Sequence, residues 1–363
     1  MSSSSDSPGH SQSFVPEEHR PRGSRWQRIA IAVSACFLLL LTVAVWNRVI
    51  TRRQHESNPV PGNFYSVEGR QMHLYCAGQG SPTILIEAGL SRDWLDWQGV
   101  QPELSHLTRV CTYDRSGLGW SEPRPGPRDA EAIARQLHTL LDEAEIERPL
   151  VLAGHSGGGF YVREFVHEFP DEVAAVVLVD STSPQQFDEL PGFRASYQEF
   201  LRNRPHRLWW ERVRVRSGLQ RLVGHCRGVP PKNLASLTGQ YAAEKCRTEY
   251  EGADVGEYVD LETAAKQASR LTSFGSKPLL IISRDPGRRT DKMTPEDAKV
   301  LAEWDREQET LKSLSPMSWR VIARGSGHEV YETRPDVIID EVSQLLAFMR
   351  GGPAPQFGST TTQ

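Results

Sequence analysis

The stretch VLAGHSGGGF, residues 151–160, places one serine among four glycines directly after a run of aliphatic residues. A dinucleotide loop needs Gly-x-Gly-x-x-Gly, and a P-loop needs a Lys-Ser/Thr pair after its last glycine. The stretch fits neither pattern. It does fit Gly-x-Ser-x-Gly, with Ser156 between Gly154 and Gly158. This pattern is typical of a sharp turn from a strand into a helix that exposes a nucleophilic serine, a nucleophile elbow.

A serine hydroxyl is a poor nucleophile at neutral pH and needs a neighbouring base, which a third group must hold in orientation. After residue 225 the chain contains a single histidine, His328, in ARGSGHEVYE. It stands directly behind the last aliphatic run, so His328 is the candidate base. His155 adjoins the serine along the chain and should therefore point elsewhere, which favours a structural role.

Attack by a serine on a carbonyl group creates an oxyanion, which backbone N–H groups must stabilise from fixed positions. We expect one donor from Gly157, the residue after the serine. The second should be Leu90, in the turn after TILIEAG, where Gly89 lets the backbone bend.

The elements that must position these residues alternate between short aliphatic runs and helical stretches from about Phe64 onward, which is typical of an α/β fold with a mostly parallel sheet. The first two strands should form a hairpin over residues 65–78. Ligands bind at the carboxyl ends of the strands in open α/β sheets. Further strands are expected at 82–89, 109–114, 149–154, 174–180, 278–283 and 319–324, with helices at 129–144 and 160–169.

About ninety residues between the fourth and fifth of these later strands do not alternate with strands, and they are too long for an ordinary loop. We interpret residues 185–275 as a helical cap over the carboxyl edge of the sheet, with a peripheral helical decoration as the alternative. Within it, RLWWERVRVR at 207–216 interleaves tryptophans and arginines. Packing of Trp209 and Trp210 against the core is the favoured interpretation, and contact with a lipid interface is the alternative.

An apolar run of eighteen residues without a charge, at 29–46, has the length of a short membrane-spanning helix and carries arginines on both flanks. We predict an uncleaved signal anchor. A cleaved signal peptide and a buried helix are the alternatives. Residues 1–28 and 351–363 are expected to be disordered tails, and residues 47–63 a stalk.

The composition outside that run is that of a soluble globular protein, and the formal net charge of −4 over 363 residues does not indicate a nucleic-acid partner. No metal-ligand cluster or cofactor loop is visible in the sequence, so we expect neither a metal nor a cofactor. No obligate protein partner is evident.

The chain from about Phe64 to Arg350 resembles the α/β-hydrolase superfamily. VCTYDRSGLGWSEP resembles the Asp-x-x-Gly-x-Gly-x-Ser stretch after the fourth strand of that superfamily, and GHSGGG and GSGHEVYETRP match its nucleophile and histidine motifs. The resemblance implies an α/β-hydrolase core over 64–184 and 276–350, with helices on both faces of the sheet. The cap would be inserted before the penultimate strand.

The resemblance also implies the chain order serine, then acid, then histidine, each at the end of a strand. Asp285 in PLLIISRDPG follows the penultimate strand, where this superfamily usually places its acid, and it is our candidate. Asp180 in VVLVDSTSP, before the cap, is a known alternative location. Asp291 is a third and weaker candidate.

Serine at the elbow disfavours epoxide opening and halide displacement, because relatives with those activities generally use aspartate there. The resemblance therefore implies acyl transfer to water, with carboxylic ester hydrolysis first. Thioesterase, amidase or aminopeptidase, and carbon–carbon bond hydrolase are alternatives on the same triad. A non-catalytic binding protein of the same fold is a further alternative.

Four cysteines lie outside the apolar run. In the superfamily's sheet order the second strand lies beside the fourth, which implies that Cys76 and Cys111 are close. Cys226 and Cys246 both fall in the cap and could form a second pair, although four reduced thiols are the alternative. An even count fits an oxidising compartment. We therefore expect a single-pass membrane protein whose catalytic domain lies outside the cytoplasm.

Overall fold

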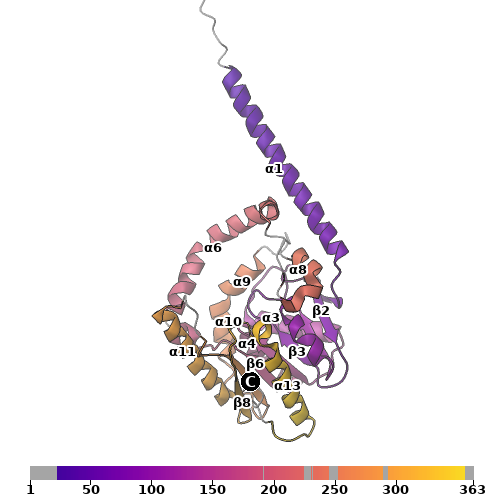
Figure 1. Ribbon diagram of the computed structural model, residues 1–363, viewed down its shortest axis with the longest axis vertical. Helices are drawn as coiled ribbons and strands as arrows, with labels where there is room; N and C mark the ends of the chain where they lie inside the picture. Colours follow the sequence, from indigo (N-terminus) through magenta and orange to yellow (C-terminus); the bar gives the residue numbers. More distant parts are fainter. Residues whose placement is uncertain are drawn as a thin grey trace, which may run out of the picture.

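The computed structural model describes residues 23–190, 192–224, 230, 232–244, 252–288 and 293–355. Within these residues the chain forms an α/β domain around one eight-stranded sheet, from which a long N-terminal helix projects (Figure 1). Most of the expected N-terminal tail and the end of the C-terminal tail lie outside the described residues. The expected fold class is confirmed.

The sheet has the strand order β1-β2-β4-β3-β5-β6-β7-β8. The first two pairings, β1 with β2 and β2 with β4, are antiparallel, and all others are parallel. The candidate residues that follow the parallel strands therefore meet at one edge. The strands are β1 (Asn63–Val67), β2 (Arg70–Ala77), β3 (Ile84–Glu87), β4 (Val110–Tyr113), β5 (Leu150–His155), β6 (Val173–Val179), β7 (Leu279–Arg284) and β8 (Ser318–Ala323).

The two faces of the sheet bury separate hydrophobic clusters, because successive side chains of a strand point to opposite sides. Leu85 faces a cluster shared with α3 (Ala130–Glu143) and α4 (Gly158–Glu168). Ile86 faces the other, shared with α13 (Pro335–Met349). The other helical elements of this core are η1 (Trp94–Gly99), α2 (Gln101–Leu104), η2 (Pro170–Glu172), α11 (Pro295–Thr310), η5 (Leu311–Leu314) and α12 (Val330–Thr333).

Between β6 and β7 the described chain is helical, in the region 185–275 that we call the helical insertion. Its last helix, α10, packs against α3 and α4 of the core. Cys226 and Cys246, the second expected cysteine pair, lie outside the described residues. The elements are α5 (Gln186–Glu189), α6 (Phe193–Arg216), α7 (Leu219–Leu222), η4 (Lys232–Leu237), α8 (Thr238–Glu244), α9 (Ala253–Val259) and α10 (Leu261–Ala268).

The N-terminal helix α1 (Gly23–Ser57) is a single unbroken helix. By length and composition, its span Arg25–Ser57 could cross a membrane. The helix continues through the first part of the expected stalk, and there it contacts α6 and α8 of the helical insertion. The apolar run and the folded domain are thus joined by helix up to Ser57.

A disulfide joins Cys76 and Cys111, which face each other in the antiparallel pairing of β2 with β4. The proximity implied by the superfamily's sheet order is confirmed. The bond ties the hairpin at the edge of the sheet to its fourth strand. Among the described residues Cys36, in α1, is a free cysteine.

The carboxyl group of Glu307 on α11 is buried, and neither of its oxygens has a hydrogen-bond partner among the described residues. Burial, together with the nearby charge of Glu189, raises the pKa of Glu307 to about 8 from an ordinary value of 4.5. The folded protein therefore holds this proton at pH values where the unfolded chain has released it. The free energy of unfolding should fall as the pH rises from about 4.5 to about 8.

Replacement Glu307→Gln removes this titration. We expect thermal melting to show a stabilised variant at pH 8.5 and a much smaller difference at pH 5. Glu309→Gln is the matched control, because the pKa of this neighbouring carboxyl is lowered by its hydrogen bond with Lys312 against a smaller effect of burial. A gain for Glu309→Gln, or an equal gain for Glu307→Gln at both pH values, would contradict the assignment.

Candidate active site

Ser156 stands at the turn between β5 and α4, with a backbone φ of 51°, in the left-handed region that side chains rarely adopt. Glycines on both sides make the turn possible. A Cβ at Gly158 would lie 2.6 Å from the carbonyl oxygens of Glu87 and Ala88, and one at Gly154 would lie 2.8 Å from a methyl carbon of Val162. The close packing of α4 on β3 and β5 therefore requires the two glycines of the expected elbow.

The structure brings Ser156 together with His328. The serine Oγ lies 2.8 Å from Nε2 of His328, which stands in the loop between β8 and α12. The other ring nitrogen of His328, Nδ1, lies 2.6 Å from Oδ2 of Asp180. A carboxylate, an imidazole and a hydroxyl thus form one hydrogen-bonded chain, the arrangement by which a base can activate a serine.

Asp285, the expected acid, is not the residue that meets His328, and the expectation is corrected in favour of Asp180. The Asp285 carboxylate accepts hydrogen bonds from the N–H groups of Gly287 and Gly325, at 2.8 and 2.9 Å. It closes the turns after β7 and β8. The reason is local, because Arg284 takes the position at the end of β7 that faces the site. Asp291 lies outside the described residues.

Asp180 is fully buried, with donors from several elements around its carboxylate. Oδ2 accepts from Nε of Arg284 at 2.5 Å, and Oδ1 accepts from the indole N–H of Trp304 at 2.9 Å and from the backbone N–H of Arg284 at 3.1 Å. Burial opposes ionisation, but the charge of Arg284 and the bond with His328 outweigh it and lower the pKa of Asp180 to about 2. The Asp180 carboxylate is therefore ionised throughout the physiological range.

Arg284 also approaches the base directly, with Nη2 2.8 Å from Nδ1 of His328. A guanidinium only donates, so Nδ1 cannot bond Asp180 through a proton and accept from Arg284 at the same time. With the proton on Nδ1, the ring donates to Asp180 and leaves Nε2 free to accept from Ser156. Arg284 and Trp304 were not singled out in the sequence analysis, because no short motif marks the residues that donate hydrogen bonds to the carboxylate of Asp180.

The two expected oxyanion donors, Gly157 and Leu90, lie in loops that touch. A Cβ at Gly157 would be 2.5 Å from Cγ of Leu90, so a larger residue there would require the Leu90 side chain to shift. Within the described part of the chain, neither backbone N–H donates a hydrogen bond. Two unengaged donors beside Ser156 are what an oxyanion requires.

A buried guanidinium holds the Leu90 loop from behind. Arg115 donates to the carbonyl oxygens of Ala88 and Gly89, at 2.8 and 2.6 Å, and forms an ion pair with Glu87 at 2.6 Å. Burial raises the pKa of Glu87 to about 7, against the opposing charge of Arg115. Arg115 belongs to the quoted DRSGLGW stretch, but the spacing of that motif did not indicate this contact.

The helical insertion contributes Glu257, from α9, to the same loop. Its carboxylate accepts from Nε of Arg115 at 2.6 Å and from the backbone N–H of Ser91 at 2.8 Å. Ser91 directly follows Leu90 and has a φ of 58°. The insertion therefore fixes the backbone that carries Leu90, the second candidate oxyanion donor. This contact of Glu257 was not found in the sequence analysis.

His155 lies against the base, as a structural neighbour. Its Nε2 is 2.9 Å from the carbonyl oxygen of His328, and the two rings are 4.7 Å apart between centroids. Burial, and then the charge of His328, lowers the pKa of His155 to about 3. A neutral His155 can donate from Nε2 and so hold the backbone of the base.

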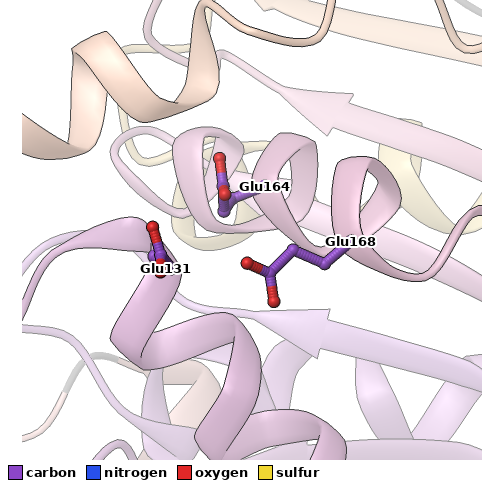
Figure 2. A group of neighbouring side chains, drawn as sticks. All are labelled: Glu131, Glu164 and Glu168. Carbon is purple, nitrogen blue, oxygen red and sulfur yellow. The ribbon is translucent and has the colours of Figure 1, made fainter.

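Three carboxylates gather away from this site, on α3 and α4: Glu131, Glu164 and Glu168 (Figure 2). Arginines account for their proximity. Arg270 forms ion pairs with Glu131 and Glu164, and Arg135 with Glu131 and Glu168. The group ties α3 and α4 to the end of the helical insertion, and we infer no metal site from it.

Replacement of Asp180 and, separately, of Asp285 by asparagine tests which of them is the acid of the triad. Asp180→Asn keeps the side-chain shape but removes the charge that orients and stabilises the imidazole. We expect fluorophosphonate labelling of Ser156 to slow by about a thousand-fold or more. Asp285→Asn should label within about threefold of wild type, since a carboxylate outside the triad contributes little to the reaction. Equal effects of the two replacements in folded protein would argue against Asp180.

Removal of the Glu257 carboxylate tests the contact from the insertion. Glu257→Ala should lower the labelling rate of Ser156 by about ten- to a hundred-fold, somewhat less than loss of an oxyanion donor itself. Glu257→Gln keeps an oxygen that can accept from Ser91 and should recover part of the rate. Glu262→Ala, which removes an ion-paired carboxylate of α10, is the control. A loss in this control as large as in Glu257→Ala would point to general destabilisation.

Comparison with known proteins gives a family and a fold. A model of the alpha/beta hydrolase fold matches residues 82–335. Among relatives, a probable transporter, efuK, of Hormonema carpetanum is 28% identical over 279 residues, covering 74% of this chain and 39% of the relative. An uncharacterised vacuolar membrane protein of Saccharomyces cerevisiae is 28% identical over 218 residues, covering 49% of this chain and 33% of the relative. This chain therefore spans well under half the length of either relative.

Among solved structures, a malate-bound thermophilic esterase from Thermogutta terrifontis has a TM-score of 0.56 with this chain at 18% identity. The alignment covers 80% of this chain and 99% of the esterase. At this identity the likeness concerns the fold.

Proposed function

The chain belongs to the α/β-hydrolase fold family, and we propose that it is a membrane-anchored serine hydrolase that cleaves a carboxylic ester through an acyl-enzyme. Ser156 is the nucleophile, His328 the general base and Asp180 the acid. The core comprises residues 64–184 and 276–350, and the helical insertion is its cap.

The observation that carries the proposal is the chain of short contacts from Ser156 through His328 to Asp180, at 2.8 and 2.6 Å. It lies at the carboxyl edge of the parallel strands, beside the N–H groups of Gly157 and Leu90, which donate no hydrogen bond within the residues that the structure describes. Nucleophile, base, orienting acid and oxyanion donors are the parts that acyl transfer needs.

In the first half of the reaction, Nε2 of His328 removes the proton from Oγ of Ser156 as the oxygen attacks the ester carbonyl. The oxyanion that forms accepts hydrogen bonds from Gly157 and Leu90. Asp180 stabilises the imidazolium and keeps its own charge, because its pKa is about 2. The imidazolium then gives its proton to the departing alcohol, and the acyl group stays on Ser156.

In the second half, water replaces the alcohol and repeats the steps in reverse order. His328 removes a proton from the water, the hydroxide attacks the acyl-enzyme, and the same two N–H groups stabilise the second oxyanion. Collapse of the second tetrahedral intermediate releases the carboxylic acid product, and His328 returns the proton to Oγ of Ser156. No residue beyond those already described is needed for the balance of protons.

The same triad could act on a thioester, an amide or a carbon–carbon bond, and the assay below separates these substrates. A binding protein that has lost catalysis is the candidate from another class. The complete chain of contacts at Ser156 favours the enzyme.

We propose that α1 anchors the protein in a membrane as a single span, with the catalytic domain outside the cytoplasm. The apolar run at 29–46, flanked by arginines, supports the span. The Cys76–Cys111 disulfide favours an oxidising compartment for the domain. The relative from Saccharomyces cerevisiae, whose name places it in the vacuolar membrane, is consistent with a membrane location.

Hydrolysis of a panel of acyl esters, a thioester and an anilide by the full chain tests this function. Ser156→Ala should keep the thermal melting temperature and lower ester turnover by about a thousand-fold or more. Full esterase activity in Ser156→Ala would refute the mechanism. An inactive wild type whose Ser156 resists fluorophosphonate would favour the binding protein.

A further inference from the structure

Large apolar side chains are exposed together at one end of the helical insertion, in the last turns of α6 and in α7. We call residues 209–223 the tip. Trp209 and Trp210 are 55% and 51% exposed, so the favoured expectation that they pack against the core is wrong. Outside α1, the described residues include nine exposed large hydrophobic side chains, and six belong to the tip: Trp209, Trp210, Val213, Leu219, Leu222 and Val223.

The tip lies against α1 at the level where its apolar run ends. Asn47, the residue after that run, donates to the carbonyl oxygen of Val215 at 3.1 Å. Arg221 donates to Asn47 at 2.9 Å and to Thr51 at 3.0 Å. A Cβ at Gly218 would lie 2.8 Å from Asn47 and 3.3 Å from Val43, within the run itself. Figure 1 shows the end of α6 beside the middle of α1.

The tip and the five residues before it are positively charged, which favours contact with a negatively charged surface. Residues 204–223 contain six arginines and one glutamate. Arg214 and Arg216 stand in the last turn of α6, among the exposed apolar residues. Tryptophans mixed with arginines are typical of protein segments at the level of lipid headgroups, where the ring is partly buried and the guanidinium meets phosphate.

The helix that ends in the tip begins beside the candidate active site. Near its start, Phe193 and Leu201 of α6 pack on the same hydrophobic cluster as Leu90, the second candidate oxyanion donor. The 24 residues of α6 would cover about 36 Å as a straight helix. One element therefore connects the neighbourhood of Ser156 with the exposed apolar surface.

From these contacts we propose that the tip docks on the headgroup region of the bilayer that α1 crosses, with anionic lipid as its preferred partner. If the tip docks in this way, the substrate is an ester dissolved in that bilayer. This consequence rests on the proposed function, whereas the docking itself does not. A water-soluble ester would reach Ser156 without help from the tip.

Quenching of tryptophan fluorescence tests the docking without any assay of activity. The full chain is reconstituted in vesicles of brominated phosphatidylcholine, with and without phosphatidylglycerol. The double replacement Trp209→Phe with Trp210→Phe should remove a part of the emission that brominated lipid quenches in the wild type. That quenched part should be larger when phosphatidylglycerol is present. Trp26 and Trp46 of α1 remain as an internal reference. If the two replacements remove only unquenched fluorescence, the tip lies in water and the proposal is wrong.

Activity gives the second arm, with a short-chain ester in water and a long-chain ester dissolved in the vesicles. Trp209→Ser with Trp210→Ser, and separately Arg214→Glu with Arg216→Glu, should lower the rate on the dissolved ester about tenfold, equivalent to about 1.4 kcal/mol of binding. The rate on the soluble ester should stay within about twofold, because the tip does not touch the triad.

Leu107→Ser is the matched control, since Leu107 is exposed but lies outside the tip. It should change neither rate. Equal losses on the two esters in the tip variants would refute docking as the route of the substrate. If the wild type hydrolyses neither ester while the fluorescence of Trp209 and Trp210 is quenched, the proposed function fails and the docking stands. If the soluble ester is hydrolysed normally but the fluorescence of Trp209 and Trp210 is not quenched, the docking fails and the proposed function stands.

Discussion

The buried charge of Asp180 is the constraint around which the carboxyl edge of the sheet is arranged. An ionised carboxylate is stable in a protein interior only when donors surround it. Here β7 supplies Arg284, α11 supplies Trp304, and the loop after β8 supplies His328. Since all three must reach one carboxylate, the imidazole has little freedom, and its second nitrogen is fixed against Ser156. The orientation of the His328 ring thus follows from the hydrogen bonds that stabilise the buried Asp180 carboxylate.

A second buried charge, that of Arg115, joins the core to the helical insertion. Glu87 belongs to a central strand and Glu257 to α9, and the guanidinium lies between them. Either carboxylate alone would leave part of the guanidinium without an acceptor at a depth where that is costly. The loop with Leu90 and Ser91 is held between the same groups. The same ion pairs therefore hold the insertion on the core and fix the loop that carries Leu90, the candidate oxyanion donor.

The fold and the meeting of Ser156 with His328 could be predicted from the sequence, because aliphatic periodicity, the elbow glycines and a solitary late histidine are local signals. The acid could not be fixed in this way. Asp180 and Asp285 both follow aliphatic strands, and the choice depends on which side chain at the end of β7 faces the site, where Arg284 stands. Glu257 and Arg115 were likewise missed, since their contact joins positions 142 residues apart. Trp209 and Trp210 look like core residues in the sequence because hydrophobicity alone does not show which face of a helix is covered.

If α1 spans the membrane as proposed, its unbroken course makes the position of the domain relative to the headgroups depend on bilayer thickness. Eighteen apolar residues extend about 27 Å as a helix, slightly less than the hydrocarbon layer of an average bilayer. A loose stalk would absorb such a mismatch, whereas the helical connection up to Ser57 passes it on to the domain. A thicker membrane would draw the insertion deeper among the headgroups, and a thinner one would lift it away. The same chain would then work differently in compartments whose membranes differ by only a few ångströms.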